Sequence, residues 1–435
     1  MTRSHQNRGR RRLTATETDL AVVEQRALLV AVAADAEIET AERSLEELEL
    51  LVDTAGARPV DIVLQRRDAP DTAGYVGSGK MAELADRCAA DDIDVVIVDD
   101  ELTPAQQANL EQACRVDVVD RVALILDIFA QHASSQEGMV QVELAQLRYR
   151  LPRLRGRGVE LSRLGAGIGT RGPGETKLET DRRRILRRVS HLERDLERLR
   201  RTRATQRRAR RRHAVPAVAL VGYTNAGKST LLNRLTGAEL LVADQLFSTL
   251  DPSTRRLELP GGETVVLSDT VGFVQKLPHQ LVEAFRSTLE EVTHADLLVH
   301  VVDGSAPDPS GQIAAVRAVL SEIGADGVPE LVAVNKTDRA DPHVVAGLLR
   351  DEEACAVSAA TGDGVEELRD RIGSRLRARH AVLELRVPFE RGDVMAALHR
   401  SGQVLEATHD DDATTVRARL APEDHGRFAE FAVSE

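Results

Sequence analysis

The first third of the chain alternates short apolar runs with longer amphipathic segments. These short runs, rich in β-branched and other apolar residues, lie at 27–34, 60–65, 94–98 and 116–119. The amphipathic segments, whose apolar residues recur every three or four positions, lie at 40–52, 81–89 and 104–113. Such runs predict strands and such segments predict helices, and their alternation at this spacing predicts a parallel sheet built of βαβ units.

A helical pattern at 136–151 is followed by a change of period. Residues 156–174 contain seven glycines, too many for a regular element, so we expect a loop there. Beyond the loop the apolar residues follow spacings of seven, four, three, four and three: Leu178, Ile185, Val189, Leu192, Leu196 and Leu199. This a/d seam predicts one long amphipathic helix, or a two-helix hairpin in which the glycine-rich loop is part of the connection.

A second alternating α/β block extends from residue 216 to about 378, and a mixed segment follows it. In that segment we expect a strand at 382–387, a helix at 392–399, strands at 404–408 and 415–420, and a last helix. The fold class is therefore α/β with a small α+β domain at the C-terminal end. The expected divisions are a disordered basic tail (1–25), an N-terminal α/β domain (26–151), a glycine-rich loop with a basic helical arm (152–213), the second α/β block (214–379) and the C-terminal α+β domain (380–435).

Charge is distributed unevenly along the 435 residues. The formal net charge is −12, but residues 182–212 carry 15 arginines against three acidic residues and so hold +12, which leaves −24 for the remainder. An acidic protein with one dense basic segment is not a general polyanion binder. The pattern predicts one place where a polyanion binds.

The lengths of the apolar runs and the spacing of the cysteines indicate in which compartment the protein is found. The longest uninterrupted apolar stretch has eight residues, whereas a membrane-spanning helix needs about 20, so we expect no membrane span. Acidic residues interrupt the segment between the N-terminal arginines and that stretch, which argues against a secretory signal. Cys88, Cys114 and Cys355 are widely spaced and form no CxxC motif, so we expect reduced core thiols in a cytosolic protein.

A phosphate-binding loop follows the strand expected at 217–221. Its residues are Gly222, Tyr223, Thr224, Asn225, Ala226, Gly227, Lys228 and Ser229, and a helical pattern comes next. This strand, loop and helix order is the context that a P-loop requires. Glycines let backbone N–H groups face a triphosphate, Lys228 reaches the β- and γ-phosphates, and the Ser229 hydroxyl ligates Mg²⁺.

A partial copy of the same spacing lies earlier in the chain. Residues 74–80 have the same glycines and a lysine, but Met81 stands where the magnesium-binding hydroxyl belongs. We interpret this copy as a glycine turn before a helix, and its role stays open.

Two further motifs follow expected strands and identify the base. Asp269, Thr270, Val271 and Gly272 supply a carboxylate that holds Mg²⁺ through water and an N–H that senses a γ-phosphate. Asn335, Lys336, Thr337 and Asp338 follow the strand at 331–334, and an ionised Asp338 accepts from both N1–H and the exocyclic amine of guanine, which adenine does not offer. Ser358, Ala359 and Ala360 follow the strand at 355–357 and are placed to contact the same base. GTP is therefore favoured over ATP, and the chain's composition agrees, because Lys228 and Lys336 are two of only five lysines beside 53 arginines.

A switch loop is expected between the P-loop and Asp269. Thr249 is the candidate second protein ligand of Mg²⁺, to be released when the γ-phosphate leaves, and an ordinary surface loop is the alternative. The segment consists of Phe247, Ser248, Thr249, Leu250 and Asp251.

With these residues in hand, the chain resembles the HflX family of ribosome-associated GTPases. The resemblance rests on the P-loop, the switch segment, the motifs at 269–272 and 335–338, and a glycine-rich stretch at 165–174 that leads through Glu175, Thr176, Lys177 and Glu179 into an arginine-rich helix. It implies an N-terminal α/β domain with a helical hairpin, a Ras-like G domain at 214–379 and a small C-terminal domain. It also implies Mg²⁺-dependent GTP hydrolysis coupled to the large ribosomal subunit, in ribosome splitting, rescue or biogenesis.

Lys228 and Asn225 are the candidate catalytic residues. Ras-like enzymes orient the attacking water with a glutamine just after DxxG, where this chain has Phe273, so we expect slow intrinsic hydrolysis that a partner accelerates. Asn225 lies where some related GTPases hold a monovalent cation, which predicts K⁺ dependence. An asparagine that merely forms the tight turn is an equal alternative.

The basic arm predicts the partner. Residues 200–212 contain eight arginines and no acidic residue, a density that favours rRNA phosphates as ligands for the arginine-rich helix 182–212. Aromatic residues make up 2% of the chain, so backbone contact to structured RNA fits better than base stacking. We expect a monomer that binds the large subunit. The alternatives are a GTP-gated switch for a protein partner without RNA, and an RNA-binding protein with a vestigial G domain, against which the intact motifs argue.

Overall fold

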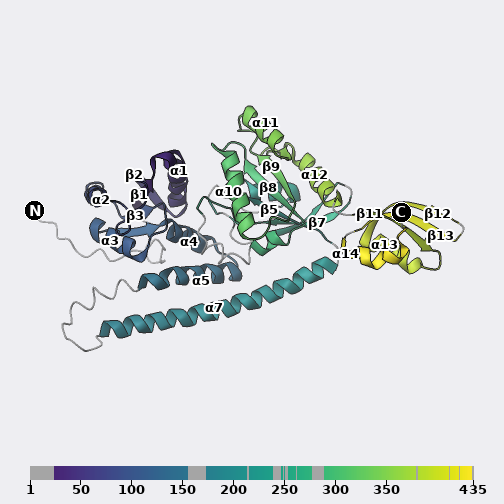
Figure 1. Cartoon of the computed structure of the whole chain (residues 1–435), viewed down its shortest axis with the longest axis horizontal. Coiled ribbons are helices and arrows are strands. Elements are labelled where there is room, and N and C mark those ends of the chain that lie inside the picture. The colour runs from purple at the N-terminus through teal and green to yellow at the C-terminus, as the bar shows by residue number, and fades with distance from the viewer. Residues whose placement is uncertain are drawn as a thin grey trace, which may run out of the picture. The chain divides into compact units, whose positions relative to one another are not determined.

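A computed structural model of the chain describes residues 24–154, 173–212, 215–238, 246–247, 249, 253–260, 262–276, 289–378, 381–410, 412–420 and 422–433 (Figure 1). The chain divides into two compact units. The first contains Met1–Glu197, Asp244–Asp251 and Gln275–Phe285, and the second contains Arg198–Ala243, Pro252–Val274 and Arg286–Glu435. Most of the tail that we expect to be disordered lies outside the described residues.

The first unit contains a four-stranded parallel sheet in the order β2-β1-β3-β4. Its strands are β1 (Gln25–Ala33), β2 (Ala57–Arg66), β3 (Val95–Val98) and β4 (Asp117–Asp120). The prediction of a parallel sheet is therefore confirmed. Strand β2 lies on one side of β1 and strand β3 on the other, so the direction of winding reverses between β1 and β3.

Helices cover both faces of this sheet. Helices α2 (Ser78–Ala90) and α3 (Pro104–Cys114) pack on one face, where Leu28 and Val30 of β1 join Leu84 and Leu110 in a buried core. Helices α1 (Ile38–Thr54) and α4 (Arg121–His132) pack on each other and cover the opposite face (Figure 1). We did not predict α4, which begins where the Asp120 side chain accepts from the Ala123 N–H.

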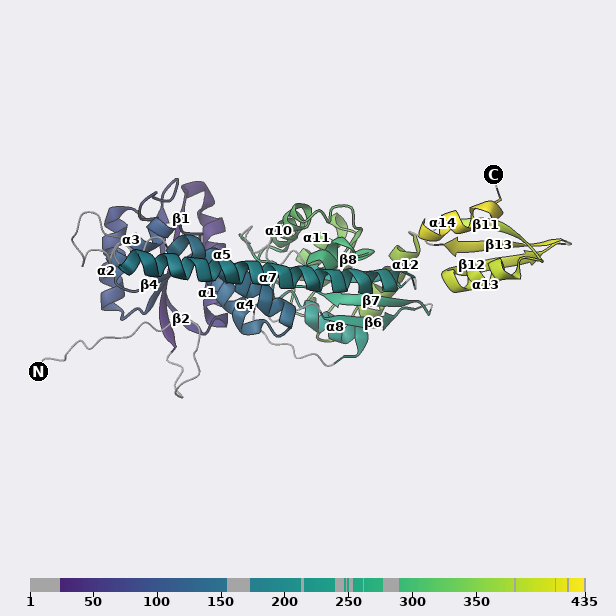
Figure 2. The same ribbon diagram turned by 90° about the horizontal axis from the view of Figure 1, so that it is seen from below.

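Helix α5 (Gln136–Arg153) packs along the part of α7 (Pro173–Arg212) that belongs to the first unit (Figure 2). Leu192 and Leu196 of the predicted seam are buried against Leu144 of α5. Arg188 pairs with Glu143 at 2.5 Å and Arg148 pairs with Glu193 at 2.8 Å, both across the two helices. The long helix and the hairpin are therefore both present. Residues 155–172 of the glycine-rich loop lie outside the described residues, and the expected loop extends too far, because residues 173 and 174 already belong to α7, whose first turn tolerates proline.

The second unit contains a six-stranded sheet in the order β10-β9-β8-β5-β7-β6, parallel except for β6. The strands are β5 (Ala217–Gly222), β6 (Thr254–Glu258), β7 (Thr264–Asp269), β8 (Leu297–Asp303), β9 (Glu330–Asn335) and β10 (Ala354–Ala356). We did not predict β6 and β8.

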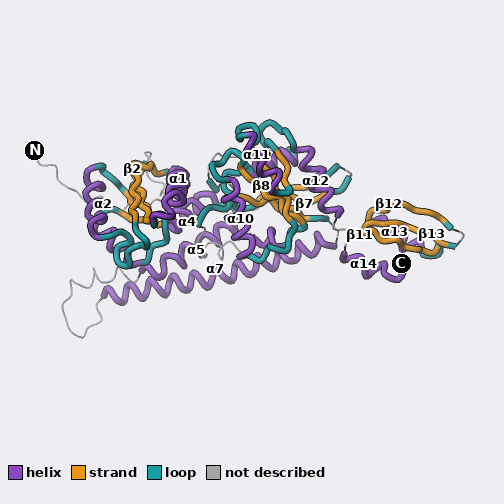
Figure 3. Tube along the Cα trace, turned by 45° about the horizontal axis from the view of Figure 1, so that its top comes forward, coloured by secondary structure: helices purple, strands orange, loops and turns teal. Residues whose placement is uncertain are grey.

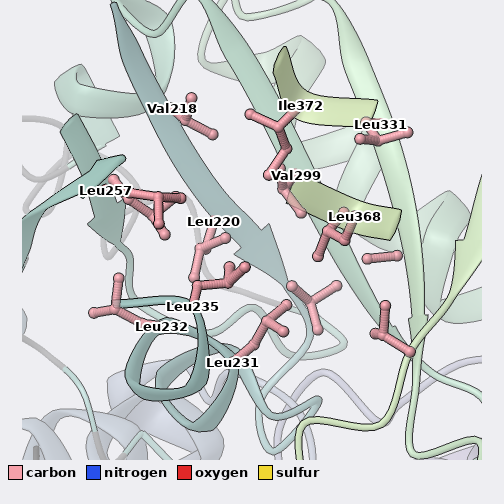
Figure 4. Packing of buried hydrophobic residues seen from close by; sticks show 14 of the residues in the cluster. Val218, Leu220, Leu231, Leu232, Leu235, Leu257, Val299, Leu331, Leu368 and Ile372 are labelled. Carbon is pink, nitrogen blue, oxygen red and sulfur yellow. The ribbon is translucent and has the colours of Figure 1, made fainter. Parts of the chain in front are cut away.

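Helices cover both faces of this sheet too. Helices α8 (Lys228–Thr236) and α12 (Val365–Ala378) pack on one face, where their leucines meet Val299 of β8 and Leu220 of β5 (Figure 4). Helices α10 (Pro309–Glu322) and α11 (Pro342–Asp351) contribute Ile313 and Leu348 to a core on the other face. Because the parallel strands end at the same edge, the loops that carry the predicted motifs meet there.

A separate antiparallel sheet follows in the order β11-β13-β12. It is formed by β11 (Ala381–Pro388), β12 (Gly402–His409) and β13 (Ala413–Leu420), with α13 (Gly392–Ser401) and α14 (Pro422–Phe428) beside it (Figure 3). Leu385, Val416 and Leu398 form its core. The predicted α+β character of this segment is confirmed. Within the described ranges, no helix is long and apolar enough to cross a membrane.

Candidate functional site

The P-loop is shaped by residues in unusual backbone conformations. Gly222 ends β5 at φ 148°, and a Cβ there would lie 2.2 Å from the Val301 carbonyl oxygen, so only glycine fits. Asn225 and Gly227 follow at φ 57° and 92°, and α8 begins at Lys228. The turn therefore directs backbone N–H groups and the start of a helix toward one point, as an anion site requires.

Lys228 is buried within this loop. Its ammonium donates to the carbonyl oxygens of Gly222 at 3.1 Å and Tyr223 at 2.8 Å. Burial lowers the pKa of Lys228 to about 8, and the Asp269 carboxylate opposes that shift. Since a buried ammonium is favoured by nearby negative charge, a phosphate at this point stabilises the charged form.

Asp269 and Ser229 bring carboxylate and hydroxyl oxygens together. Asp269 ends β7 fully buried, and its Oδ2 accepts from the Ser229 hydroxyl at 2.5 Å. Thr270 is also fully buried and donates to the Leu220 carbonyl oxygen at 2.7 Å, so its hydroxyl anchors β7 to β5. Oxygen donors of this kind are the ligands that Mg²⁺ prefers.

Gly272 passes directly beside the P-loop. Thr224 N–H donates to the Phe273 carbonyl oxygen at 2.7 Å, and Phe273 N–H donates to the Gly222 carbonyl oxygen at 3.1 Å. A Cβ on Gly272 would lie 2.9 Å from Thr224 Cα and 3.1 Å from Lys228 Nζ. The close approach accounts for glycine at this position and places its backbone next to the Lys228 ammonium.

Asn335 links the other two motifs to the P-loop. Its side-chain Nδ2 donates to the Ala226 carbonyl oxygen at 2.8 Å, and its Oδ1 accepts from Ala359 N–H at 2.9 Å. Asn335 is buried, so both bonds are shielded from water. The P-loop and the loop at 358–360 are thereby fixed relative to each other.

Asp338 is held as an ionised carboxylate. A hydrogen bond of 2.6 Å from the Ser358 hydroxyl, its largest influence, lowers the pKa of Asp338. Lys336 adopts φ 61° and pairs with Asp303 at 2.7 Å, while the Thr337 hydroxyl donates to the Val357 carbonyl oxygen. The motifs at 335–338 and 358–360 therefore lie in direct contact at the ends of neighbouring strands.

Two residues around this site were not among the candidates. Asp303 ends β8, a strand we did not predict, and it is the partner of Lys336. Arg234 of α8 donates to the carbonyl oxygens of Ala359, at 3.1 Å, and Ala360. Asp303 has the same signal as the known motifs, a carboxylate after an apolar run, whereas nothing in the sequence marks Arg234.

The switch segment is described in part. Phe247 belongs to the first unit, where its buried ring packs edge-on against Phe129 with centroids 4.6 Å apart. Its side chain therefore serves packing. Thr249 is half-buried, and the other three residues predicted there, Ser248, Leu250 and Asp251, lie outside the described residues.

In the partial copy at residues 74–80, the glycine N–H groups of the turn before the helix are bound within the chain itself. Asp71 Oδ1 accepts from Gly74 N–H and Gln65 Oε1 accepts from Gly77 N–H, both at 3.0 Å. Lys80 pairs with Glu83 at 2.7 Å. Helix α2 begins at Ser78, so the interpretation as a turn before a helix is confirmed.

Known GTPase families and relatives match this sequence over most of its length. Three family models match it: GTP-binding GTPase N-terminal at 42–130, GTP-binding GTPase Middle Region at 132–210, and 50S ribosome-binding GTPase at 217–336. The chain is 48% identical to the GTPase HflX of Caldanaerobacter subterraneus subsp. tengcongensis over 96% of either sequence. It is 42% identical to the GTPase HflX of Escherichia coli, covering 86% of this chain and 89% of that protein. A crystal structure of a GTP-binding protein from the archaeon Sulfolobus solfataricus in complex with GDP matches at 25% identity, with a TM-score of 0.42, over 81% of this chain and 98% of that one.

Proposed function

The chain belongs to the HflX family of ribosome-associated GTPases, and on that basis we propose that it binds the large ribosomal subunit and acts in ribosome splitting, rescue or biogenesis in the cytoplasm. It hydrolyses GTP. The matched family whose name specifies the 50S ribosome covers residues 217–336, which include the P-loop, the switch segment at 247–251 and the motif at 269–272. The large subunit is therefore the partner that we assign to this chain.

The basic arm is the observation that carries the assignment. Helix α7 runs for 40 residues, and its apolar seam packs on α5 through Val189, Leu192 and Leu196. The eight arginines of residues 200–212 follow that seam on the same continuous helix. Arginines at this density repel one another, and rRNA phosphates remove that repulsion while releasing counterions.

We assign the nucleotide contacts from the motif positions. Lys228 contacts the β- and γ-phosphates, the Gly272 N–H senses the γ-phosphate, and Asp338 reads guanine, with Ser358, Ala359 and Ala360 beside the base. The proximity of Gly272 to Lys228 and the lowered pKa of Asp338 support these roles.

The oxygen donors beside Lys228 fit a magnesium ion. The Ser229 hydroxyl and the Asp269 carboxylate lie within 2.5 Å of each other at the end of β7. Ser229 and Thr249 are the proposed protein ligands, with Asp269 acting through water, and Thr249 is chosen by its place in the sequence. When bound, the ion neutralises charge on the β- and γ-phosphates.

Hydrolysis is expected to be slow without a partner. Phe273, at the position of the water-orienting glutamine in Ras-like enzymes, is buried and carries no group that polarises water. Asn225 is exposed at φ 57°, a conformation that asparagine adopts more readily than most residues. That conformation explains an asparagine without any cation, so the K⁺ role stays a proposal. Turnover that is faster in K⁺ than in Na⁺ supports it, and equal rates contradict it.

Binding to purified large subunits at two salt concentrations tests the role of the arm. We expect Arg210→Gln, Arg211→Gln and Arg212→Gln together to weaken binding and to reduce the slope of log affinity against log salt by about two to three. The matched control removes the same charge from Arg182, Arg183 and Arg184, which already have acidic partners on their own helix and should matter less. Binding that ignores both salt and the first triple substitution would instead favour a protein partner without RNA.

A further inference from the structure

The N-terminal sheet has a carboxylate pair at the place where doubly wound sheets bind their ligands. Such sheets take ligands at the carboxyl ends of the two strands between which the winding reverses. Here those strands are β1 and β3, and Asp99 and Asp100 follow directly after β3. Asp99 is completely buried, whereas Asp100 is partly exposed.

This position is filled by a lysine from the segment that follows Gly272. Lys276, which belongs to the same compact unit, donates to Asp99 Oδ2 at 2.7 Å and to Asp100 Oδ1 at 2.8 Å. Asp99 also accepts from the Ser44 hydroxyl at 2.7 Å and from Arg121 Nη1 at 2.8 Å. The Tyr75 hydroxyl donates to Asp100 at 2.6 Å. The two carboxylates are thus oriented by residues of the first unit: Asp99 Oδ2 accepts from both Ser44 and Lys276, and Asp100 accepts from Tyr75 through Oδ2 and from Lys276 through Oδ1.

The residue before Lys276 is held by the same cluster. Arg121 Nη2 donates to the Gln275 carbonyl oxygen at 3.1 Å and also pairs with Glu47. Arg121 is buried, with 1% of its side chain exposed. The contacts to two successive residues and to a main-chain carbonyl group indicate recognition of this segment, beyond a single surface ion pair.

Charge balance makes the contact depend on Lys276. Asp99 pairs with both Arg121 and Lys276, and Lys276 also pairs with Asp100. Without Lys276 the fully buried Asp99 would lose one of these two ion pairs, a loss that is costly in a low-dielectric environment. Lys276 is also one of only five lysines in a chain with 53 arginines.

We propose that Asp99 and Asp100 form a receptor for Lys276 through which the N-terminal unit reads the nucleotide state of the G domain. Lys276 lies four residues after Gly272, so the inference rests on the proposed role of Gly272 as the γ-phosphate sensor. With GDP, Lys276 stays on the carboxylate pair. When the γ-phosphate engages the Gly272 N–H, the following residues shift and Lys276 leaves the pair. Asp99, Asp100, Glu47 and Arg121 are then released to respond to the nucleotide.

Lysine acylation of the unmodified full-length protein tests the proposal directly. Although partial burial acts against it, the two carboxylates raise the pKa of Lys276, which reduces the fraction of reactive neutral amine. We expect a short pulse of an acetylating reagent, read by peptide mass spectrometry, to modify Lys276 at least about fivefold faster with a non-hydrolysable GTP analogue and Mg²⁺ than with GDP. Lys80, which pairs with Glu83 in the same unit, is the internal control and should not change. Equal or slower acylation of Lys276 with the GTP analogue overturns the proposal.

A second measurement separates this failure from a failure of nucleotide binding. The affinities for GDP and for the GTP analogue are measured by fluorescence for the unmodified protein, Lys276→Gln and Lys276→Arg. Since the contact favours the GDP state, its loss in Lys276→Gln should raise the ratio of GTP-analogue affinity to GDP affinity about tenfold, while Lys276→Arg keeps the ratio near that of the unmodified protein. A ratio unchanged in Lys276→Gln, with both nucleotides still bound, contradicts the receptor and leaves the nucleotide site intact. Loss of binding to both nucleotides in the unmodified protein would contradict the nucleotide site itself.

Discussion

Because the Lys228 ammonium is buried, nucleotide binding should be coupled to proton uptake by this side chain. Its pKa of about 8 in the folded protein lies below its ordinary value of 10.5, so between these values the unfolded chain binds more protons. The free energy of unfolding should therefore rise with pH through this window as far as Lys228 is concerned. Phosphates have the opposite effect on the site, because they favour the charged lysine and raise its pKa.

Proton uptake on GDP binding is the first prediction at this scale. Near pH 9 the free protein holds Lys228 largely neutral, so binding should take up close to one proton, and the uptake should fall toward zero near pH 7. Calorimetry in buffers of different ionisation enthalpy measures the number. Lys228→Arg, which stays charged throughout, is the control and should show no uptake. Absence of uptake at pH 9 in the unmodified protein would show that the lysine is already charged before binding.

Motif spacing in the sequence was enough to select many residues of the site. It did not predict which contacts those residues make. Gly222 and Gly272 could be selected because a phosphate-binding backbone needs glycine, and the structure adds the clashes that a Cβ would cause. The two hydrogen bonds of Asn335, by contrast, join residues 109 and 24 positions away. Arg234 and Lys276 likewise act through partners distant in sequence, so no local pattern marks them.

At the scale of elements, hydrophobic periodicity identified helices and strands that have one apolar face. It missed elements whose residues are buried on almost all sides or on almost none. Helix α4 is mostly apolar, with seven of its 12 residues buried, and such a short apolar run is ambiguous between a strand and a buried helix. Strand β6 is a short edge strand with only Leu257 buried, and strand β8 is almost continuously apolar. Burial on all sides or on almost none removes the signal on which the prediction depends.

The helical hairpin should depend on its apolar seam much more than on its ion pairs. Leu192→Ala removes a side chain buried against Leu144 and should lower the free energy of unfolding of the hairpin by about 2–4 kcal/mol. Arg188→Ala breaks an exposed pair with Glu143 and should cost about 0–1 kcal/mol. Amide hydrogen exchange of α5 and α7 in the two variants measures the difference. Equal loss of protection in both would mean that charge, and not packing, holds the helices together.

At the scale of the whole molecule, the long helix α7 gives residues to both compact units. Its first part packs on α5, and its last part carries the eight arginines of residues 200–212. The fold class and the motif-bearing loops could be predicted from the sequence. The assignment of Gln275 and Lys276 to the first unit could not be predicted, because it arises from contacts with Asp99, Asp100 and Arg121 far away in the chain.

GTP hydrolysis with and without purified large ribosomal subunits tests the central claim most directly. It should be measured at two salt concentrations for the unmodified protein and for Lys228→Ala. The account predicts slow turnover alone, strong stimulation by the subunits that weakens at higher salt, and no stimulated turnover in Lys228→Ala. Turnover that the subunits leave unchanged at both salt concentrations would contradict the claim that this GTPase is activated by the large subunit.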